Sequence, residues 1–295
     1  PEARAVDVHA AVSVARALDG VDALVNAVGP YRYDPAQLVR ACTETGVHYV
    51  DLAEGPAFLA RARDAAKVAS VAVVPGCSTV PGMLELLARP FFALPGAARI
   101  DAWLSMGSAN AVSAALLDGL LAPLGRAAPD GARYFGELET REIGDRRLRF
   151  GRHPAALADA PIPVRLHVGF DRAPLVFALR AVAPGLGRLS EAAVSRLARV
   201  GAPLASVVRP FGTPRGVLRV EALDPASRTL ASVEVEAREH GLDVPAWPAV
   251  WAVRRLLQKG AGPGGALSLG DLVPRAEALA ALRGAGFDVR ENLSS

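Results

Sequence analysis

The chain has 295 residues, of which 51% are hydrophobic, and its 33 basic and 30 acidic residues leave a net charge of +3. The basic residues form no run and do not alternate with aromatic residues, so the sequence argues against a nucleic-acid-binding protein. Two cysteines are too few for a disulfide framework, and no Cys/His cluster has the spacing of a metal site. No apolar run reaches the ~18 residues that a membrane span needs, and no signal peptide is visible. These features predict a cytoplasmic globular protein with one large domain or two ordinary ones.

The first residues predict the end of a strand over 3–8, closing on Asp7, and then a helix over 9–18. A dinucleotide-binding domain is expected to open with a strand, a G-x-G-x-x-G turn and a helix. That opening unit is absent from the sequence, which begins at Pro1. We therefore expect either a fragment or a misassigned start, and weak binding of a dinucleotide's phosphates by this chain alone.

Strands and helices then alternate up to residue 82. The apolar runs that predict strands cover 23–28, 47–52 and 71–74, and the helical segments between them cover 34–46 and 56–69. Asp34 is placed to cap the first of these helices and Gly46 to end it. Apolar strands that alternate with helices predict a parallel sheet covered on both faces, an α/β fold of Rossmann-like type that is truncated at its N-terminus.

Polar or glycine-containing loops follow the three strands, at 29–32, 51–54 and 76–82. In parallel sheets, ligands bind at the carboxyl ends of the strands. We therefore expect these loops to converge on one cleft that faces a second domain.

The pattern changes near residue 95, where strands begin to alternate apolar and polar residues. This second half predicts an α+β domain with a mixed or antiparallel sheet, and its clearest element is a hairpin over 216–237. Other elements are predicted as strands over 99–106, 163–168 and 175–182, short strands within 126–163, helices over 112–124, 245–259 and 276–282, and a last short strand within 286–295. The predicted domains are 1–95, 96–240 and 241–295, the last packing its helices back on the first.

Two later glycine strings imitate a phosphate-binding motif. Residues 260–265 fit G-x-G-x-x-G but follow a helix, which favours a plain loop. Residues 185–190 follow the predicted strand 175–182, but Ser190 replaces the third glycine, so this match is weak.

Three blocks of the first half resemble the cofactor domain of the saccharopine dehydrogenase-like family. They are Val25-Asn-Ala-Val-Gly-Pro-Tyr31, Ala41-Cys-Thr-Glu-Thr-Gly-Val-His-Tyr-Val-Asp51 and Val74-Pro-Gly-Cys77. The resemblance implies hydride transfer between NADP or NAD, with NADP favoured, and a small-molecule substrate of the imine, amino-acid or lipid-linked type. The residues that it places at the cofactor are Asp7, Ala27, Val28, Gly29, Pro30, Tyr31 and Asp51.

The residues alone leave other interpretations open for these positions. Gly29-Pro30 is equally an ordinary turn after a strand. Asp7, which the resemblance places at the adenine, is also suited to cap the next helix. The family usually has Gly-Glu after the acidic residue, whereas this chain has Glu54-Gly55, so the loop that begins at Asp51 is expected to differ in shape.

The predicted substrate cleft contains Arg32, Glu54, Cys77 and Ser78. Arg32 is suited to bind a carboxylate or phosphate, or is simply a solvated arginine. The turn at Cys77 and Ser78 precedes a helix, so its backbone amides are suited to an anionic substrate group, and a thiol nucleophile is the weaker alternative. No catalytic acid or base can be named from the sequence.

The leading hypothesis is therefore an NAD(P)-dependent oxidoreductase of the saccharopine dehydrogenase-like class. The alternative is a non-catalytic chain that keeps the fold as a partner- or lipid-binding module, a hypothesis favoured by the missing glycine-rich unit. The substrate is not determined by the sequence, and a homodimer is left open.

Overall fold

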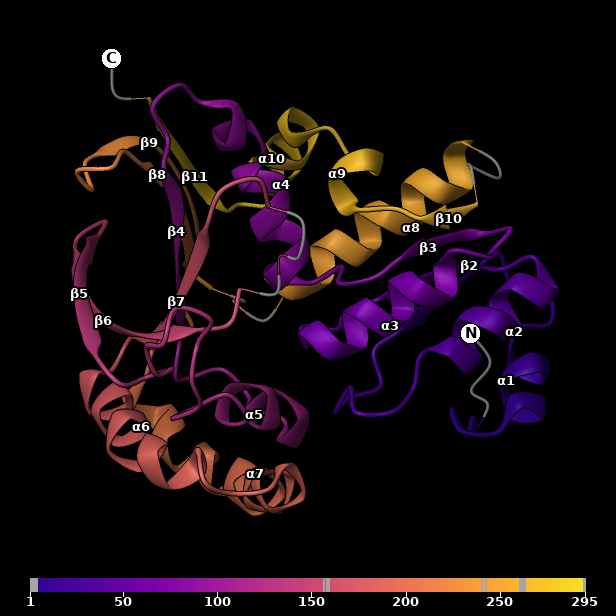
Figure 1. Ribbon diagram of the computed structural model, residues 1–295, viewed down its shortest axis with the longest axis horizontal. Coiled ribbons are helices and arrows are strands. Elements are labelled where there is room, and N and C mark those ends of the chain that lie inside the picture. The colour runs from indigo at the N-terminus through magenta and orange to yellow at the C-terminus, as the bar shows by residue number, and fades with distance from the viewer. Residues whose placement is uncertain are drawn as a thin grey trace. The chain divides into compact units, whose positions relative to one another are not determined.

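The computed structural model describes residues 5–155, 157, 160–239, 241, 243–259 and 264–293 (Figure 1). The chain forms two compact units. Unit 1 comprises Pro1–Leu86 and Pro245–Ala278, and unit 2 comprises Leu87–Val244 and Leu279–Ser295.

Unit 1 contains a parallel sheet of four strands in the order β1-β2-β3-β10. The strands are β1 (Ala23–Asn26), β2 (His48–Asp51), β3 (Ala72–Val74) and β10 (Gly265–Ala266). The helices of this unit are α1 (Ala11–Ala17), α2 (Ala36–Thr45), α3 (Pro56–Ala66), η1 (Thr79–Met83), α8 (Trp247–Lys259), α9 (Leu269–Leu272) and the start of α10 (Arg275–Gly284). The helices α2 and α3 lie on one side of the sheet and α8 on the other (Figure 1). The prediction of a covered parallel sheet is thus confirmed.

Local sequence signals explain where the helix α2 begins and ends. The Asp34 carboxylate accepts a hydrogen bond from the Ala36 N–H at 3.0 Å. Gly46 ends the helix with φ of 73°, and its N–H bonds to the Cys42 carbonyl. Only glycine adopts this left-handed conformation without a steric cost, so Gly46 stops the helix as predicted.

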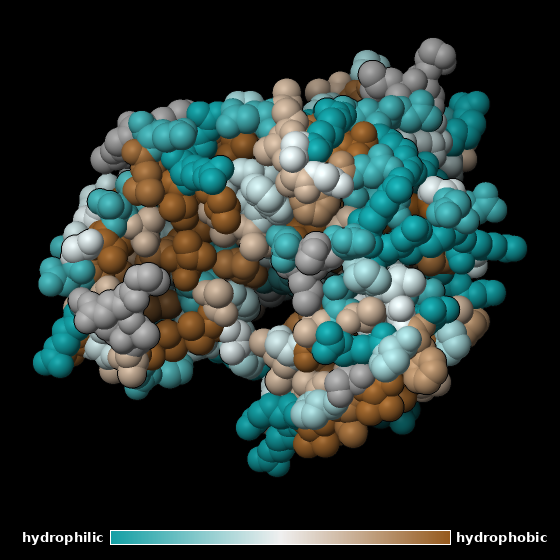
Figure 2. Space-filling model, turned by 180° about the vertical axis from the view of Figure 1, so that it is seen from behind, coloured by the Kyte–Doolittle hydropathy of each residue, from teal (hydrophilic) through white to brown (hydrophobic). Residues whose placement is uncertain are grey.

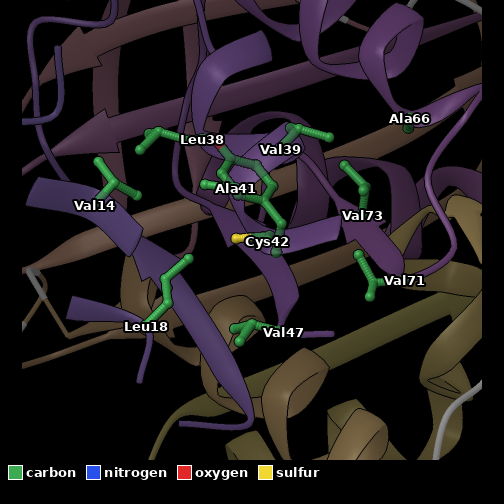
Figure 3. Packing of buried hydrophobic residues seen from close by; sticks show 11 residues of the cluster. Val14, Leu18, Leu38, Val39, Ala41, Cys42, Val47, Ala66, Val71 and Val73 are labelled. Atoms are coloured by element: carbon green, nitrogen blue, oxygen red, sulfur yellow. The ribbon is translucent and has the colours of Figure 1, made fainter. Parts of the chain in front are cut away.

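The core of unit 1 is formed where α1 and α2 pack beside the sheet (Figure 3). Its buried residues include Val14, Leu18, Leu38, Val39, Cys42, Val47, Val71 and Val73. Cys42 is fully buried, and this burial raises the pKa of its thiol to about 12. Cys42 is therefore a core residue.

Unit 2 contains a separate sheet of seven strands in the order β11-β9-β8-β4-β7-β6-β5. The strands are β4 (Arg99–Met106), β5 (Leu138–Ile143), β6 (Arg146–His153), β7 (Val164–Phe170), β8 (Gly216–Leu223), β9 (Thr229–Ala237) and β11 (Asp288–Leu293). Only β4 and β7 pair in parallel, and the other pairs are antiparallel. The predicted mixed sheet and its β8–β9 hairpin are confirmed.

The helices that begin in unit 2 or at its border connect and flank this sheet. They are α4 (Leu84–Ala88), η2 (Arg89–Ala93), α5 (Ala114–Leu121), α6 (Ala173–Leu186), α7 (Glu191–Ala205), η3 (Ser206–Phe211) and η4 (Val244–Ala246). Because β11 pairs with β9, the C-terminal range 241–295 contributes helices to unit 1 and a strand to unit 2.

Three local predictions were wrong. The strand predicted over 175–182 is helix α6, whose buried residues Val176, Ala183 and Leu186 recur at helical spacing. The sequence of this segment is a continuous apolar run, and such a run is compatible with both a buried strand and a helix. Gly185 is therefore a helical residue rather than part of a loop after a strand. Residues 5–8 form no strand, although the end of a strand was predicted over 3–8. In the loop predicted over 260–265, Gly265 belongs to β10 instead, and residues 260–263 lie outside the described residues.

Candidate functional site

The carboxyl ends of β1, β2 and β3 lie at one edge of the unit 1 sheet. The register pairs Asn26 with Asp51 and Val50 with Val74, so the three strands end at nearly the same level. Backbone hydrogen bonds then join the loops, because the Leu52 N–H bonds to the Asn26 carbonyl at 3.2 Å and the Cys77 N–H to the Asp51 carbonyl at 2.6 Å. Hydrogen bonds therefore join the three loops at one edge of the sheet. The loop after β1 and Glu54 are exposed there, whereas residues 76–82 are buried beneath them.

The buried side chain of Asp51 connects the second and third loops by hydrogen bonds. Its side chain is fully buried, and Oδ1 accepts hydrogen bonds from the N–H groups of Ala53 at 2.9 Å and Gly76 at 2.8 Å. Desolvation raises the pKa of this carboxyl, and the two backbone N–H groups act in the opposite direction. The observed role of Asp51 is thus to position the loops, and its predicted contact with a cofactor stays a prediction.

Asn26 organises the loop that follows β1, a role that the sequence analysis missed. Its Nδ2 donates to the Tyr49 hydroxyl at 3.0 Å, and its Oδ1 accepts from the Tyr33 hydroxyl at 2.9 Å. The Tyr31 hydroxyl donates to the Asn26 carbonyl at 3.2 Å. The signal that could have identified it is a lone amide at the end of an apolar strand, where a buried polar group requires partners.

Phe58 of α3 supports the same loop through ring contacts. Tyr31 and Tyr33 approach its ring edge-on, with centroids 5.1 and 5.4 Å away. Burial raises the pKa of both tyrosines, so their hydroxyls remain protonated donors at neutral pH. The loop is thereby fixed, and it leaves exposed the predicted cofactor residues Ala27, Val28 and Pro30.

Glu54 and Ser78 form a pair between the second and third loops. The Ser78 Oγ lies 3.1 Å from Glu54 Oε1 and 3.0 Å from the Val80 carbonyl oxygen. The Ser78 hydroxyl can donate to the ionised carboxylate, which lowers the pKa of Glu54, or accept from the protonated carboxyl and donate to Val80. Desolvation by the surrounding protein raises the pKa of Glu54 to about 7, although the residue keeps an exposed surface through which water moderates this rise.

We expect Glu54→Gln to raise the free energy of unfolding of unit 1 by about 1 kcal/mol at pH 8 and to leave it nearly unchanged at pH 5. The pKa of about 7 in the folded protein exceeds the ordinary value of 4.5, so the folded state holds a proton that the unfolded state has lost. Stability from this carboxyl is therefore present at low pH and is lost as the pH rises through 7. Urea unfolding at both pH values measures the effect, with Glu44→Gln on the exposed face of α2 as the control. A difference independent of pH would contradict the raised pKa.

The turn at Cys77 uses its backbone donors within the protein. The N–H groups of Gly76, Cys77 and Ser78 donate to Asp51 Oδ1, the Asp51 carbonyl and the Gly76 carbonyl. This bonding speaks against the expectation that these amides bind an anionic group. Cys77 is fully buried, and desolvation raises the pKa of its thiol well above the usual value, the opposite of an activated nucleophile.

Asp7 and Arg32 lie at the border of this surface. Asp7 is exposed, and its Oδ1 accepts from the His9 N–H at 2.9 Å while its own N–H donates to Ser13 Oγ at 3.0 Å. Asp7 thus stabilises the turn before α1, but it does not cap this helix as the alternative expected, because the N-cap is Ala10 and has no side-chain cap bond. Arg32 lies in the loop after β1 and is partly exposed. Among the described residues, no group of acidic residues, histidines or cysteines is arranged to hold a metal ion.

A parallel α/β unit with polar loops at the carboxyl ends of its strands has the architecture of a dinucleotide-binding domain. Residues 2–74 match the family model described as the saccharopine dehydrogenase NADP binding domain. The resemblance seen in the sequence is confirmed.

The whole chain is similar in fold to apo histidine-tagged saccharopine dehydrogenase (L-Glu forming) from Saccharomyces cerevisiae. The TM-score is 0.59 at 11% identity, and the match covers 100% of this chain and 89% of that chain. An amine dehydrogenase from Mycobacterium smegmatis matches with a TM-score of 0.44 and 12% identity over 88% of this chain and 79% of that one. No curated protein matches the chain. At these identities the first likeness defines the fold alone.

Proposed function

We propose that the chain is an oxidoreductase that binds NADP(H) at the carboxyl ends of β1, β2 and β3. The observation that carries the proposal is the loop after β1, which Tyr31 and Tyr33 anchor to Phe58 and Asn26 at the edge of the domain that matches the family model. Ala27 and Gly29 have no side chain beyond Cβ, so a flat ring can approach their backbone closely. When bound, NADP(H) supplies or accepts the hydride.

The chain's own residues would orient the cofactor and supply a proton to the substrate. In this proposal Ala27, Val28, Gly29, Pro30 and Tyr31 lie under the cofactor. Glu54 lies at the same edge of the sheet with a raised pKa that favours its protonated form near pH 7, and Ser78 Oγ bonds to its Oε1 and to the Val80 carbonyl. A substrate with a C=N bond, or a lipid-linked substrate with a C=C bond, requires one hydride and one proton for its reduction, and Glu54 is placed to supply the proton.

A second candidate is a non-catalytic module that binds a partner through the same fold. The observation in its favour is β1, which is an edge strand of the described sheet and exposes Val25 to solvent. Binding of NADPH separates this candidate from the enzyme.

We expect Gly29→Val to weaken NADPH binding at least tenfold, about 1.4 kcal/mol, because a branched side chain would hold the ring away from the backbone. Titration of NADPH fluorescence measures this change. Gly119→Val in unit 2 is the matched control, since an added Cβ at Gly119 meets no atom within 4 Å. Circular dichroism verifies that both variants fold.

The outcomes separate the parts of the proposal. Wild-type protein that does not bind NADPH would refute the oxidoreductase and favour the non-catalytic module. Wild-type binding that Gly29→Val leaves unchanged would keep the cofactor and refute its position at the loop after β1.

A further inference from the structure

Helix α7 and the helical turn η3 present an apolar stripe to solvent. Leu197, Val200, Leu204 and Val207 are exposed, the last three by 67%, 63% and 67%. They recur at spacings of three, four and three residues, which places them on one side of a helix. The stripe continues to Phe211, which is 69% exposed. A run of large apolar side chains this exposed is unusual on a soluble surface and indicates an interaction site.

The opposite side of α7 already accounts for the packing of this helix. Val194 and Ala198 are buried, and α7 packs against α5. Ser195 Oγ donates to the Asp118 carboxylate of α5 at 2.8 Å. The helix therefore has its core contacts without the exposed stripe.

Helix α6 extends the apolar surface. Phe177 and Val182 of α6 are exposed, and so is Leu189 between α6 and α7, while the buried face of α6 packs on β6 and β7. The Arg149 guanidinium lies 4.9 Å from the centre of the Phe177 ring. Hydrophobic side chains gather along the lower margin of Figure 2, where α6 and α7 lie. We refer to the exposed residues of α6, α7, η3 and the turn between α6 and α7 as the α6–α7 surface.

The charges around this surface are almost all positive. Residues 173–214 contain five arginines and one acidic residue, Glu191. The arginines are exposed, and in the part of the chain that the structure describes none of them forms an ion pair with a carboxylate; they are Arg180, Arg188, Arg196, Arg199 and Arg209. Apolar side chains bordered by arginines are the composition of helices that lie in the interface of a membrane.

We propose that the α6–α7 surface docks unit 2 onto an anionic lipid bilayer, with the apolar stripe inserted among the lipids and the arginines at their headgroups. A second copy of the chain fits less well, because a symmetric contact through this surface would bring two sets of arginines together. Nucleic acid fits less well, because its phosphates would bind the arginines but would make no apolar contact with the stripe. No helix among the described residues is long and apolar enough to cross a bilayer, so the contact is one of surface binding. The inference does not depend on cofactor binding.

The test is co-sedimentation of the full chain with vesicles of phosphatidylcholine alone or mixed with phosphatidylglycerol. We expect binding to the mixed vesicles, at least tenfold weaker binding to the neutral ones, and a decrease as salt is added. Leu204→Ser with Val207→Ser should reduce the partition coefficient at least tenfold, and Arg196→Glu with Arg199→Glu should do the same. Val68→Ser is the control, because Val68 is 88% exposed but lies in unit 1.

Three results would overturn the proposal: no binding of the wild type to anionic vesicles, equal binding to both kinds of vesicle, or equal loss with Val68→Ser. A wild-type dimer in solution that the Leu204 and Val207 substitutions convert to a monomer would assign the surface to a second copy instead. Unchanged thermal melting of each variant verifies that the substitutions leave the fold intact.

Discussion

Replacing Asp51 with alanine is expected to lower the free energy of unfolding of unit 1 by about 2–4 kcal/mol. The substitution removes the acceptor of the Ala53 and Gly76 N–H groups, which lie at the ends of two different loops. Asp51 is fully buried, so no water replaces the lost acceptor, and each buried unsatisfied N–H costs about 1–3 kcal/mol. Removal of a buried carboxylate, which is itself costly to desolvate, offsets part of this loss. Urea unfolding followed by a probe in unit 1 measures the change.

The control for this prediction is Asp51→Asn, whose amide oxygen accepts the same two hydrogen bonds. We expect the asparagine variant to lose less than half as much stability as the alanine variant. Equal losses would mean that the charge, and not the hydrogen bonds, is what unit 1 requires at this position. NADPH titration of both variants then reports whether the loops need Asp51 in order to bind the cofactor.

Replacing Glu221 with alanine is expected to destabilise unit 2 by about 3–5 kcal/mol. Glu221 of β8 is fully buried and is the common acceptor of three side chains. Its Oε2 accepts from Trp103 Nε1 at 3.0 Å and also from Arg141, and its Oε1 accepts from Arg219 Nε at 2.8 Å. Without the carboxylate, Arg141 and the Trp103 indole N–H lose this acceptor, and Arg219 keeps Glu234 at 3.2 Å. Removing one partner of a buried ion pair leaves the remaining charge poorly compensated, which is strongly destabilising.

A stacked pair on the same face of the sheet gives this prediction a second readout. The Trp103 ring lies on the His167 ring with centroids 4.1 Å apart. Tryptophan fluorescence should therefore change in Glu221→Ala even under conditions where the variant is folded. Glu142→Ala is the control, because Glu142 is exposed on β5 and its loss should stay within about 0.5 kcal/mol. A loss below 1 kcal/mol in Glu221→Ala would show that the network contributes little to stability.

Much of unit 1 followed from local patterns in the sequence. The apolar runs that end in turns predicted β1, β2 and β3, and their alternation with helices predicted the parallel pairing. Asp34 and Gly46 set the limits of α2 through bonds to residues at most four positions away, which is the range that sequence patterns describe. The right-handed crossover rule then placed the three loops at one edge.

The strand predicted over 175–182 shows where local patterns stop being sufficient. An apolar run of this length satisfies a buried strand and a helix equally well. The choice depends on what packs against it, and here β6 and β7 receive the face of α6 that carries Val176 and Ala183. The apolar residues left on the outer side then form part of the α6–α7 surface, which periodicity alone did not reveal.

Local patterns in the sequence were enough to predict the α/β class, the resemblance of the first half to a known family and the strand ends at which a ligand is expected. Three contacts could not be predicted in this way: the bond of Asp51 to Gly76, the bonds of Asn26 to three tyrosines, and the pairing of β11 with β9. The physical reason is distance along the chain. Hydrophobic periodicity and capping act over one or two helical turns, whereas the partners of a buried polar group are whichever donors and acceptors the packed fold brings within about 3 Å.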